Sequence, residues 1–159
     1  MPNEDFPRVW DIEAEKHELY ELLTDDSKKI SPFHGKNFAD VFIYAMTIGF
    51  HKKLRLPIKK RMGSVNFSAL KDMEWVIRAI AVSETGELNI LKNKHDIANI
   101  AEEYANGGIE YLRKLIYEEE PGEAYKRMEA ELRTLLAPFT DSEGRISATS
   151  LASNKSDRR

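Results

Sequence analysis

The chain has no cysteine among its 159 residues. Disulfide bonds, thiolate nucleophiles and cysteine-ligated zinc sites are therefore excluded. It also lacks a long apolar run, because the longest mostly apolar stretch, residues 41–50, is too short to cross a bilayer. The N-terminal residues are acidic and have no apolar segment of the kind that a signal peptide needs. These absences predict a soluble, cytoplasmic protein that makes no membrane contact.

Catalytic signatures are missing as well. The sequence contains no nucleophile elbow, no phosphate-binding loop with its lysine, and no dinucleotide fingerprint. None of the four histidines forms a His-x-x-x-His pair. We therefore expect a non-enzymatic protein without cofactor or metal. The alternative is a small metal-dependent nuclease, and the side chains that could serve it are Glu84, His95, Asp96, Glu102 and Glu103.

The charge of the chain is unevenly distributed. The whole chain has a net charge of −3, yet residues 51–61 contain six basic residues and no acid. We call residues 51–61 the basic loop. Its basic residues are Lys52, Lys53, Arg55, Lys59, Lys60 and Arg61. A compact positive segment on an acidic protein favours a polyanionic partner, of which nucleic acid is the commonest.

The basic loop favours one kind of nucleic-acid contact. Lysine and arginine side chains neutralise phosphates whatever the base sequence is. No aromatic residue lies inside the loop, so it offers no stacking platform for single strands, and contact with a duplex backbone is the better hypothesis. Two alternatives stay open. The loop could be a solvated segment that pairs with acidic residues of this chain, or it could dock on an acidic partner protein.

Apolar residues recur at helical spacing along most of the chain. The pattern predicts helices over residues 12–23, 38–48, 69–82, 94–105, 109–116 and from 121 onward. Asn37 is placed to cap the second of these, which is apolar around most of its circumference and leaves room for a homo-oligomer interface. We expect an all-α, compact bundle of five to six helices with a basic inter-helix loop. Residues 1–139 form the predicted single domain, and residues 140–159 a disordered polar tail.

Glycines are predicted to end helices at two places. Asn106, Gly107 and Gly108 interrupt the helical spacing and indicate a structural turn, with a helix end and a kink. Gly49 stands where a left-handed residue would close the second helix. The alternative for the glycine pair is an exposed backbone that binds an anion or lets another backbone approach closely.

Several segments together resemble a known family. They are residues 38–50 with the basic loop as far as Pro57, residues 80–85 with 90–91, and residues 100–112. The most specific of them is Glu-Tyr-Ala-Asn-Gly-Gly at residues 103–108. In order and spacing they resemble the Dnd system-associated protein 4 family, small proteins encoded beside DNA-phosphorothioation gene clusters. The resemblance covers roughly residues 12–116.

The resemblance implies a setting, and it supplies no catalytic residues. It points to a prokaryotic defence system of the restriction-modification kind, in which sulfur in the DNA backbone marks self. Other proteins of a Dnd-type complex would then be partners. Combined with the basic loop, this predicts an accessory protein that contacts the DNA backbone. The alternative is an adaptor subunit of the same complex that binds proteins without touching DNA.

Overall fold

The structure, a computed structural model, describes residues 5–118 and 123–137. Its contacts divide the chain into two units, residues 1–118 and residues 119–159. The second unit contributes helix α6, Glu123–Leu136, in which Glu129 pairs with Arg133 one turn later. The predicted single domain, 1–139, includes residues of both units, and the predicted tail, 140–159, lies outside the described residues.

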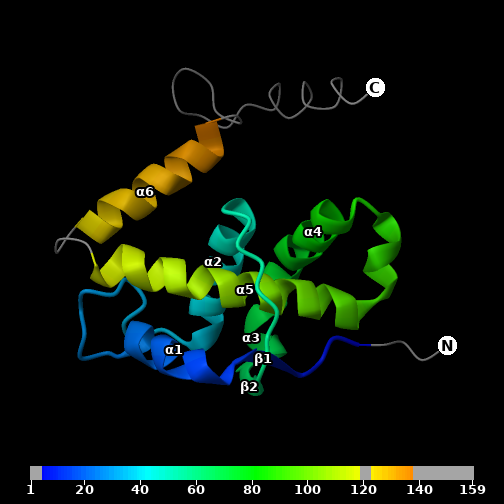
Figure 1. The fold of residues 1–159 in the computed structure, drawn as a ribbon, viewed down its shortest axis with the longest axis horizontal. Helices are drawn as coiled ribbons and strands as arrows, with labels where there is room; N and C mark the ends of the chain where they lie inside the picture. The colour runs from blue at the N-terminus through cyan, green and yellow to red at the C-terminus, as the bar shows by residue number, and fades with distance from the viewer. Residues whose placement is uncertain (1–4, 119–122, 138–159) are drawn as a thin grey trace. The chain divides into compact units, whose positions relative to one another are not determined.

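Two helices form the centre of the first unit (Figure 1). They are α2, Phe38–His51, and α5, Lys94–Tyr117, and both are buried along much of their length. The predicted cap of α2 is confirmed. The Asn37 side chain accepts from the Asp40 amide, and the Asp40 carboxylate accepts in return from the Asn37 amide. This reciprocal pair satisfies two N–H groups that the start of a helix leaves without partners.

The helices α2 and α5 cross with their backbones in contact. A Cβ atom on Gly108 would lie 1.8 Å from the carbonyl oxygen of Ala45, and one on Gly49 would lie 2.2 Å from that of Tyr104. No real side chain tolerates such distances. Both glycines therefore sit inside helices because the facing helix occupies the space that a side chain would need.

The predicted turn at Asn106, Gly107 and Gly108 is wrong, because α5 runs unbroken through all three residues. Gly49 does not end a helix either, since it lies inside α2, and the left-handed residue is Lys53 with φ 57°. Glycine costs helix stability in isolation, but here the packing between helices outweighs that local preference. The close backbone approach, left open as an alternative, is what the structure shows.

A two-stranded antiparallel sheet was not expected. It joins β1, Val9–Glu13, to β2, Arg61–Asn66, with Trp10 opposite Val65. The predicted first helix therefore begins later than residue 12. Trp10 is fully buried, and its ring stacks on that of Phe67 at a centroid distance of 5.7 Å. The expectation of a mostly helical fold is confirmed, with this small sheet as its addition.

Short elements complete the first unit. They are η1, Ala14–Lys16; α1, His17–Thr24; α3, Phe67–Leu70; η2, Lys71–Met73; α4, Glu74–Thr85; and η3, Leu88–Lys92. The helix expected over 69–82 is thus divided into α3, η2 and α4. Within the described parts of the chain, no helix is both long enough and apolar enough to span a membrane.

Candidate nucleic-acid interface

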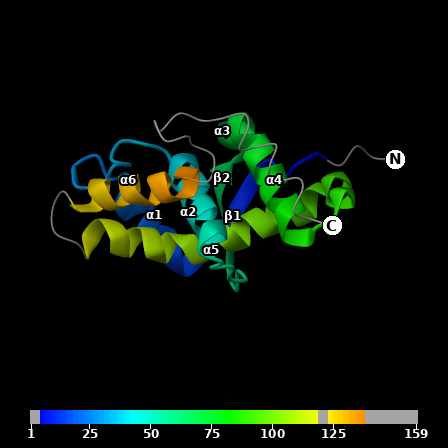
Figure 2. The same cartoon turned by 90° about the horizontal axis from the view of Figure 1, so that it is seen from above.

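The basic loop crosses α5 on its way from α2 to β2. Figure 1 shows the segment running across the helix, and in Figure 2 part of it projects past α5. The Leu56 amide donates to the Glu103 carbonyl of α5 at 3.1 Å. A Cβ on Gly107 would lie 1.6 Å from the Leu54 carbonyl oxygen. The loop backbone therefore lies directly on the helix, and Gly107 is what lets it do so.

Asn106 holds the middle of the loop. Its side-chain amide donates to the carbonyl oxygens of Leu56 and Pro57, at 3.1 and 3.2 Å. The residue is only 6% exposed, and its Oδ1 atom has no partner among the described residues. Its own carbonyl accepts from the Lys16 ammonium at 2.8 Å. Asn106 thus connects the loop, α5 and η1 through hydrogen bonds. Its Oδ1 atom is left as a buried acceptor, and such atoms usually bind a donor from solvent or a ligand.

Arg55 fastens the loop just before its middle. Its guanidinium donates to Glu103 at 2.5 Å and to Glu84 at 2.7 Å, and it lies over the Tyr104 ring. The Tyr104 hydroxyl donates to the same Glu84 carboxylate. The bonds from Tyr104 and Arg55 lower the pKa of Glu84, whereas burial and this carboxylate raise the pKa of Tyr104 to about 12. Arg55 is therefore engaged within the fold.

Arg61 fastens the end of the loop where β2 begins. It donates to Glu102 at 2.6 Å, to Asn99 at 2.5 Å and to Asp11 at 3.2 Å. Glu102 is 4% exposed, and its second oxygen accepts from the Asp11 amide. Burial raises the pKa of Glu102, although the bonds from Asp11 and Arg61 act against this rise. A buried carboxylate of this kind needs its arginine.

Glu13 closes the loop against β1. Its two carboxylate oxygens accept from the amides of Lys59 and Lys60, at 2.7 and 2.9 Å. The Lys60 carbonyl accepts from the Ala14 amide in return. The bond from the Lys59 amide is the largest cause of the lowered pKa of Glu13. Two consecutive amides that could have received an external anion are already satisfied inside the fold.

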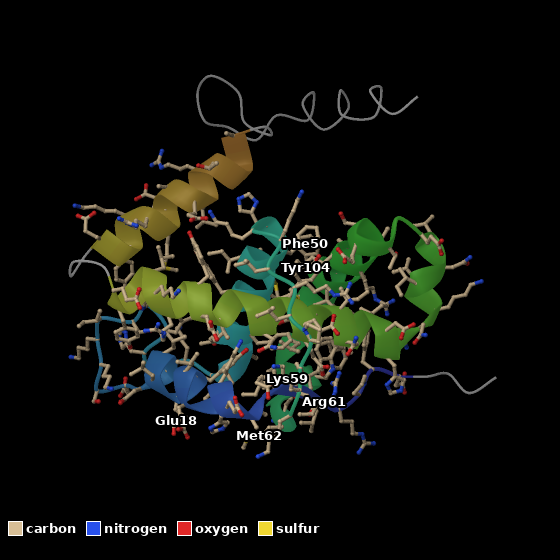
Figure 3. The ribbon with its side chains drawn as sticks, in the orientation of Figure 1. Glu18, Phe50, Lys59, Arg61, Met62 and Tyr104 are labelled. Atoms are coloured by element: carbon tan, nitrogen blue, oxygen red, sulfur yellow. The ribbon has the colours of Figure 1, made fainter. Side chains whose placement is uncertain are left out.

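The six basic residues divide by type. All six are exposed, but the side chains of the two arginines are engaged in the ion pairs just described. The four lysines are Lys52, Lys53, Lys59 and Lys60. The Lys52 ammonium lies 5.2 Å above the centre of the Tyr111 ring. Within the residues that the structure describes, Lys53, Lys59 and Lys60 form no ion pair. Figure 3 labels Phe50 and Tyr104 at the α2 end of the loop, and Lys59 and Arg61 at its β2 end.

A cavity of about 360 Å³ lies beside the loop. Leu56 and Pro57 supply apolar wall, and Leu56 is 46% exposed. Its charged and polar lining comes from the end of β1, from η1, from the loop and from α5. In that order the residues are Glu13, Glu15, Lys16, Lys59, Lys60 and Asn106. An apolar surface bordered by ammonium groups is therefore open to solvent at this place.

The carboxylates considered for a nuclease are engaged elsewhere. Arg55 binds Glu84 and Glu103, and Arg61 binds Glu102. Asp96 accepts from the Asn93 side chain at the start of α5. In residues 5–118 and 123–137, no three histidine, aspartate or glutamate side chains are arranged to hold a metal ion.

Sequence reasoning identified the basic loop and missed what holds it. It treated arginines and lysines alike, whereas the planar fork of arginine suits paired carboxylates and lysine remains a mobile point charge. The preference of arginine for carboxylates, together with the adjacent acids Glu102 and Glu103, could have suggested the division. Nothing in the sequence pattern pointed to Glu13 or to the anchoring role of Asn106.

One comparison with known proteins gives a match. Residues 11–137 match the family of DNA sulphur modification system-associated protein 4. The matched range extends past residue 116, where the resemblance seen in the sequence ends, and takes in α6. No curated protein and no solved structure matches the chain. The family match covers most of the sequence, so the chain belongs to the family of DNA sulphur modification system-associated protein 4.

Proposed function

We propose that this protein is a non-enzymatic accessory component of a DNA sulphur modification system, and that its basic loop contacts the backbone of duplex DNA. One observation supports this most directly. The loop holds four exposed lysines on a backbone that is fixed in its middle, at Arg55 and Leu56, and at its β2 end, at Arg61. The family match supplies the association with the modification system.

The fixed backbone favours binding. A segment that is ordered before it meets DNA loses less conformational entropy on binding than a mobile loop would. The lysines still carry flexible stems, so each ammonium can reach a phosphate without an exact fit. Such contacts set affinity and salt dependence and do not read bases. The expected binding is therefore independent of sequence and weakened by salt.

Charge reversal tests the proposal. The double variant Lys59→Glu/Lys60→Glu should bind a duplex at least about tenfold more weakly, and the slope of log affinity against log salt should fall by about 2. Fluorescence anisotropy over a salt series measures both quantities. The matched control is Lys28→Glu/Lys29→Glu, which makes the same charge change at two exposed lysines outside the loop. An equal loss in the control would assign the effect to net charge and contradict the proposal.

A second candidate function is a protein-binding adaptor of the same system. It is favoured by an exposed apolar surface on α4 and η3, where Trp75 is 70% and Leu88 is 74% exposed. Ala79, Val82 and Leu91 line a shallow cavity beside Trp75. Under the adaptor hypothesis, Trp75→Ala should abolish binding to another purified protein of the system, or self-association measured by sedimentation. The wild-type protein should not retain DNA at moderate salt.

A further inference from the structure

We propose that the cavity beside Lys59 and Lys60 receives the sulfur atom of a phosphorothioate in the DNA backbone. The protein would then bind modified DNA more tightly than unmodified DNA. This inference rests on the proposed contact between the basic loop and DNA, and it adds a chemical preference to that contact. It follows from the apolar surface that the cavity wall presents and from the fact that its backbone N–H groups are already hydrogen-bonded.

The two forms of DNA differ in one atom. In a phosphorothioate, sulfur replaces a non-bridging oxygen, and the group keeps its negative charge. Sulfur is larger and more polarizable than oxygen, and it is a weaker hydrogen-bond acceptor. A site that prefers sulfur should therefore supply cations for the charge and an apolar contact for the replaced atom. It should also lack hydrogen-bond donors at that contact, because an oxygen there would lose its bonds to water.

The wall formed by Leu56 and Pro57 fits the second requirement. Pro57 has no backbone N–H, and the Leu56 amide already donates to Glu103. The carbonyls of both residues are occupied by the Asn106 side chain. The wall therefore presents hydrocarbon and no free backbone donor. An isolated leucine that is almost half exposed needs no explanation, but the Leu56 backbone is hydrogen-bonded and its side chain lines a cavity together with Lys59 and Lys60, which suits it to contact a ligand.

The neighbouring backbone adds no donor either. The amides of Lys59 and Lys60 are engaged by the buried Glu13 carboxylate. The cations that remain at the cavity are the ammonium groups of Lys59 and Lys60 and that of Lys16, which pairs with Glu110. The first two can bind the remaining non-bridging oxygen and offset the negative charge of the group, while the sulfur contacts the wall.

Opposing charge is present at the same cavity. Glu13 is held by two amides, which offset its charge locally, but Glu15 is exposed and lines the cavity. Glu15 should weaken the binding of any phosphate, modified or not, because its repulsion acts on the charge that both share. It therefore provides a way to separate attraction for the charge from preference for sulfur.

The experiment compares two duplexes of one sequence, one of which carries a single phosphorothioate. Each configuration at phosphorus is prepared as a separate duplex. The wild-type protein should bind one modified duplex about fourfold more tightly than the unmodified one, as expected for burying one methyl-sized apolar group. Leu56→Ser should lose the preference, so that its affinities for the modified and unmodified duplexes become equal. Glu15→Gln should tighten the binding of both duplexes and retain the preference for the modified one.

The outcomes separate this inference from the proposed function. Equal binding of all duplexes by the wild-type protein would overturn the sulfur preference and leave the DNA contact standing. No binding at low salt would overturn both. A preference that persists in Leu56→Ser would overturn the assignment to this cavity. If circular dichroism shows that Leu56→Ser is not folded, Leu56→Ala takes its place, with a reduced preference as the expected result.

Discussion

The crossing of α2 and α5 and the basic loop are both places where backbone lies against α5, yet they are held by different forces. At the crossing, glycines remove side-chain volume so that the helices touch. Along the loop, arginine, asparagine and glutamate side chains bind the backbone and one another. The crossing depends on the absence of side-chain atoms alone, whereas the loop depends on charges and hydrogen bonds in addition to the missing side chain of Gly107.

This difference determines what should disturb each region. Added volume cannot be accommodated at the crossing, because interiors are close-packed and the obstructing atoms belong to backbone. Acid, in contrast, acts on the carboxylates that hold the loop, and removal of one partner leaves the other buried or unpaired. The α2–α5 crossing should therefore be sensitive to added methyl groups, and the loop to changes in charge as well as to a methyl group at Gly107.

The largest expected effect is that of Gly108→Ala. The new methyl would lie 1.8 Å from the Ala45 carbonyl oxygen, so α2 and α5 would have to separate. The free energy of unfolding should fall by about 3 kcal/mol or more, measured by urea denaturation. Gly86→Ala is the matched control, since its Cβ meets no atom within 4 Å and only its φ of 72° is unfavourable. It should cost about 1 kcal/mol, and equal losses in the two variants would contradict steric exclusion at the crossing.

Arg61→Ala should have the next largest effect. It removes the partner of the buried Glu102 carboxylate and two further bonds at the end of the loop. Because Arg61 is 46% exposed, water recovers part of the loss, and we expect about 2 kcal/mol of destabilisation. Lys60→Ala removes a neighbouring cation that makes no ion pair within the described residues, and it should change stability by less than about 0.5 kcal/mol. Equal effects in thermal denaturation would show that the arginines and lysines do not differ in role.

The helical class of the fold could be predicted from the sequence because it depends on local periodicity. The cap at Asn37 and the basic loop were also found in this way, since each is encoded within a few neighbouring residues. The sheet was missed because β1 is five residues long and pairs with a strand some fifty positions away. Apolar spacing from Ile12 onward fits a helix as well as it fits that strand.

The role of the glycines in α5 could not be predicted from local pattern. Gly107 and Gly108 resemble a helix end by every local criterion, and only the facing backbones of Leu54 and Ala45 explain them. The same limit applies to the candidate site. The sequence showed six cations, but which of them would find buried or half-buried carboxylates depended on how α5 and β1 meet the loop.

The smallest predicted effect concerns acid and the ion pairs that Arg55 makes in the loop. Bonds from Tyr104 and Arg55 lower the pKa of Glu84 below its ordinary value of 4.5. Since the folded-state pKa is the lower one, Glu84 stabilises the fold above that value, and this contribution disappears as pH falls through the folded-state pKa. The contribution of Glu102 to stability changes with pH in the opposite direction. Because its pKa is raised in the folded state, that contribution declines as pH rises past 4.5.

Glu84→Gln should therefore flatten the acid side of the stability curve. It should be about 0.5 kcal/mol less stable than wild type near neutral pH, as is usual for a partly exposed ion pair, and should approach wild type as pH falls through the lowered pKa of Glu84. Glu87→Gln is the control, because the Glu87 carboxylate makes no ion pair within the described residues. Urea denaturation at a series of pH values measures both variants. If the difference in free energy of unfolding between wild type and Glu84→Gln stays constant with pH, the charge of Glu84 does not stabilise the loop. Its hydrogen bonds alone would then account for the difference.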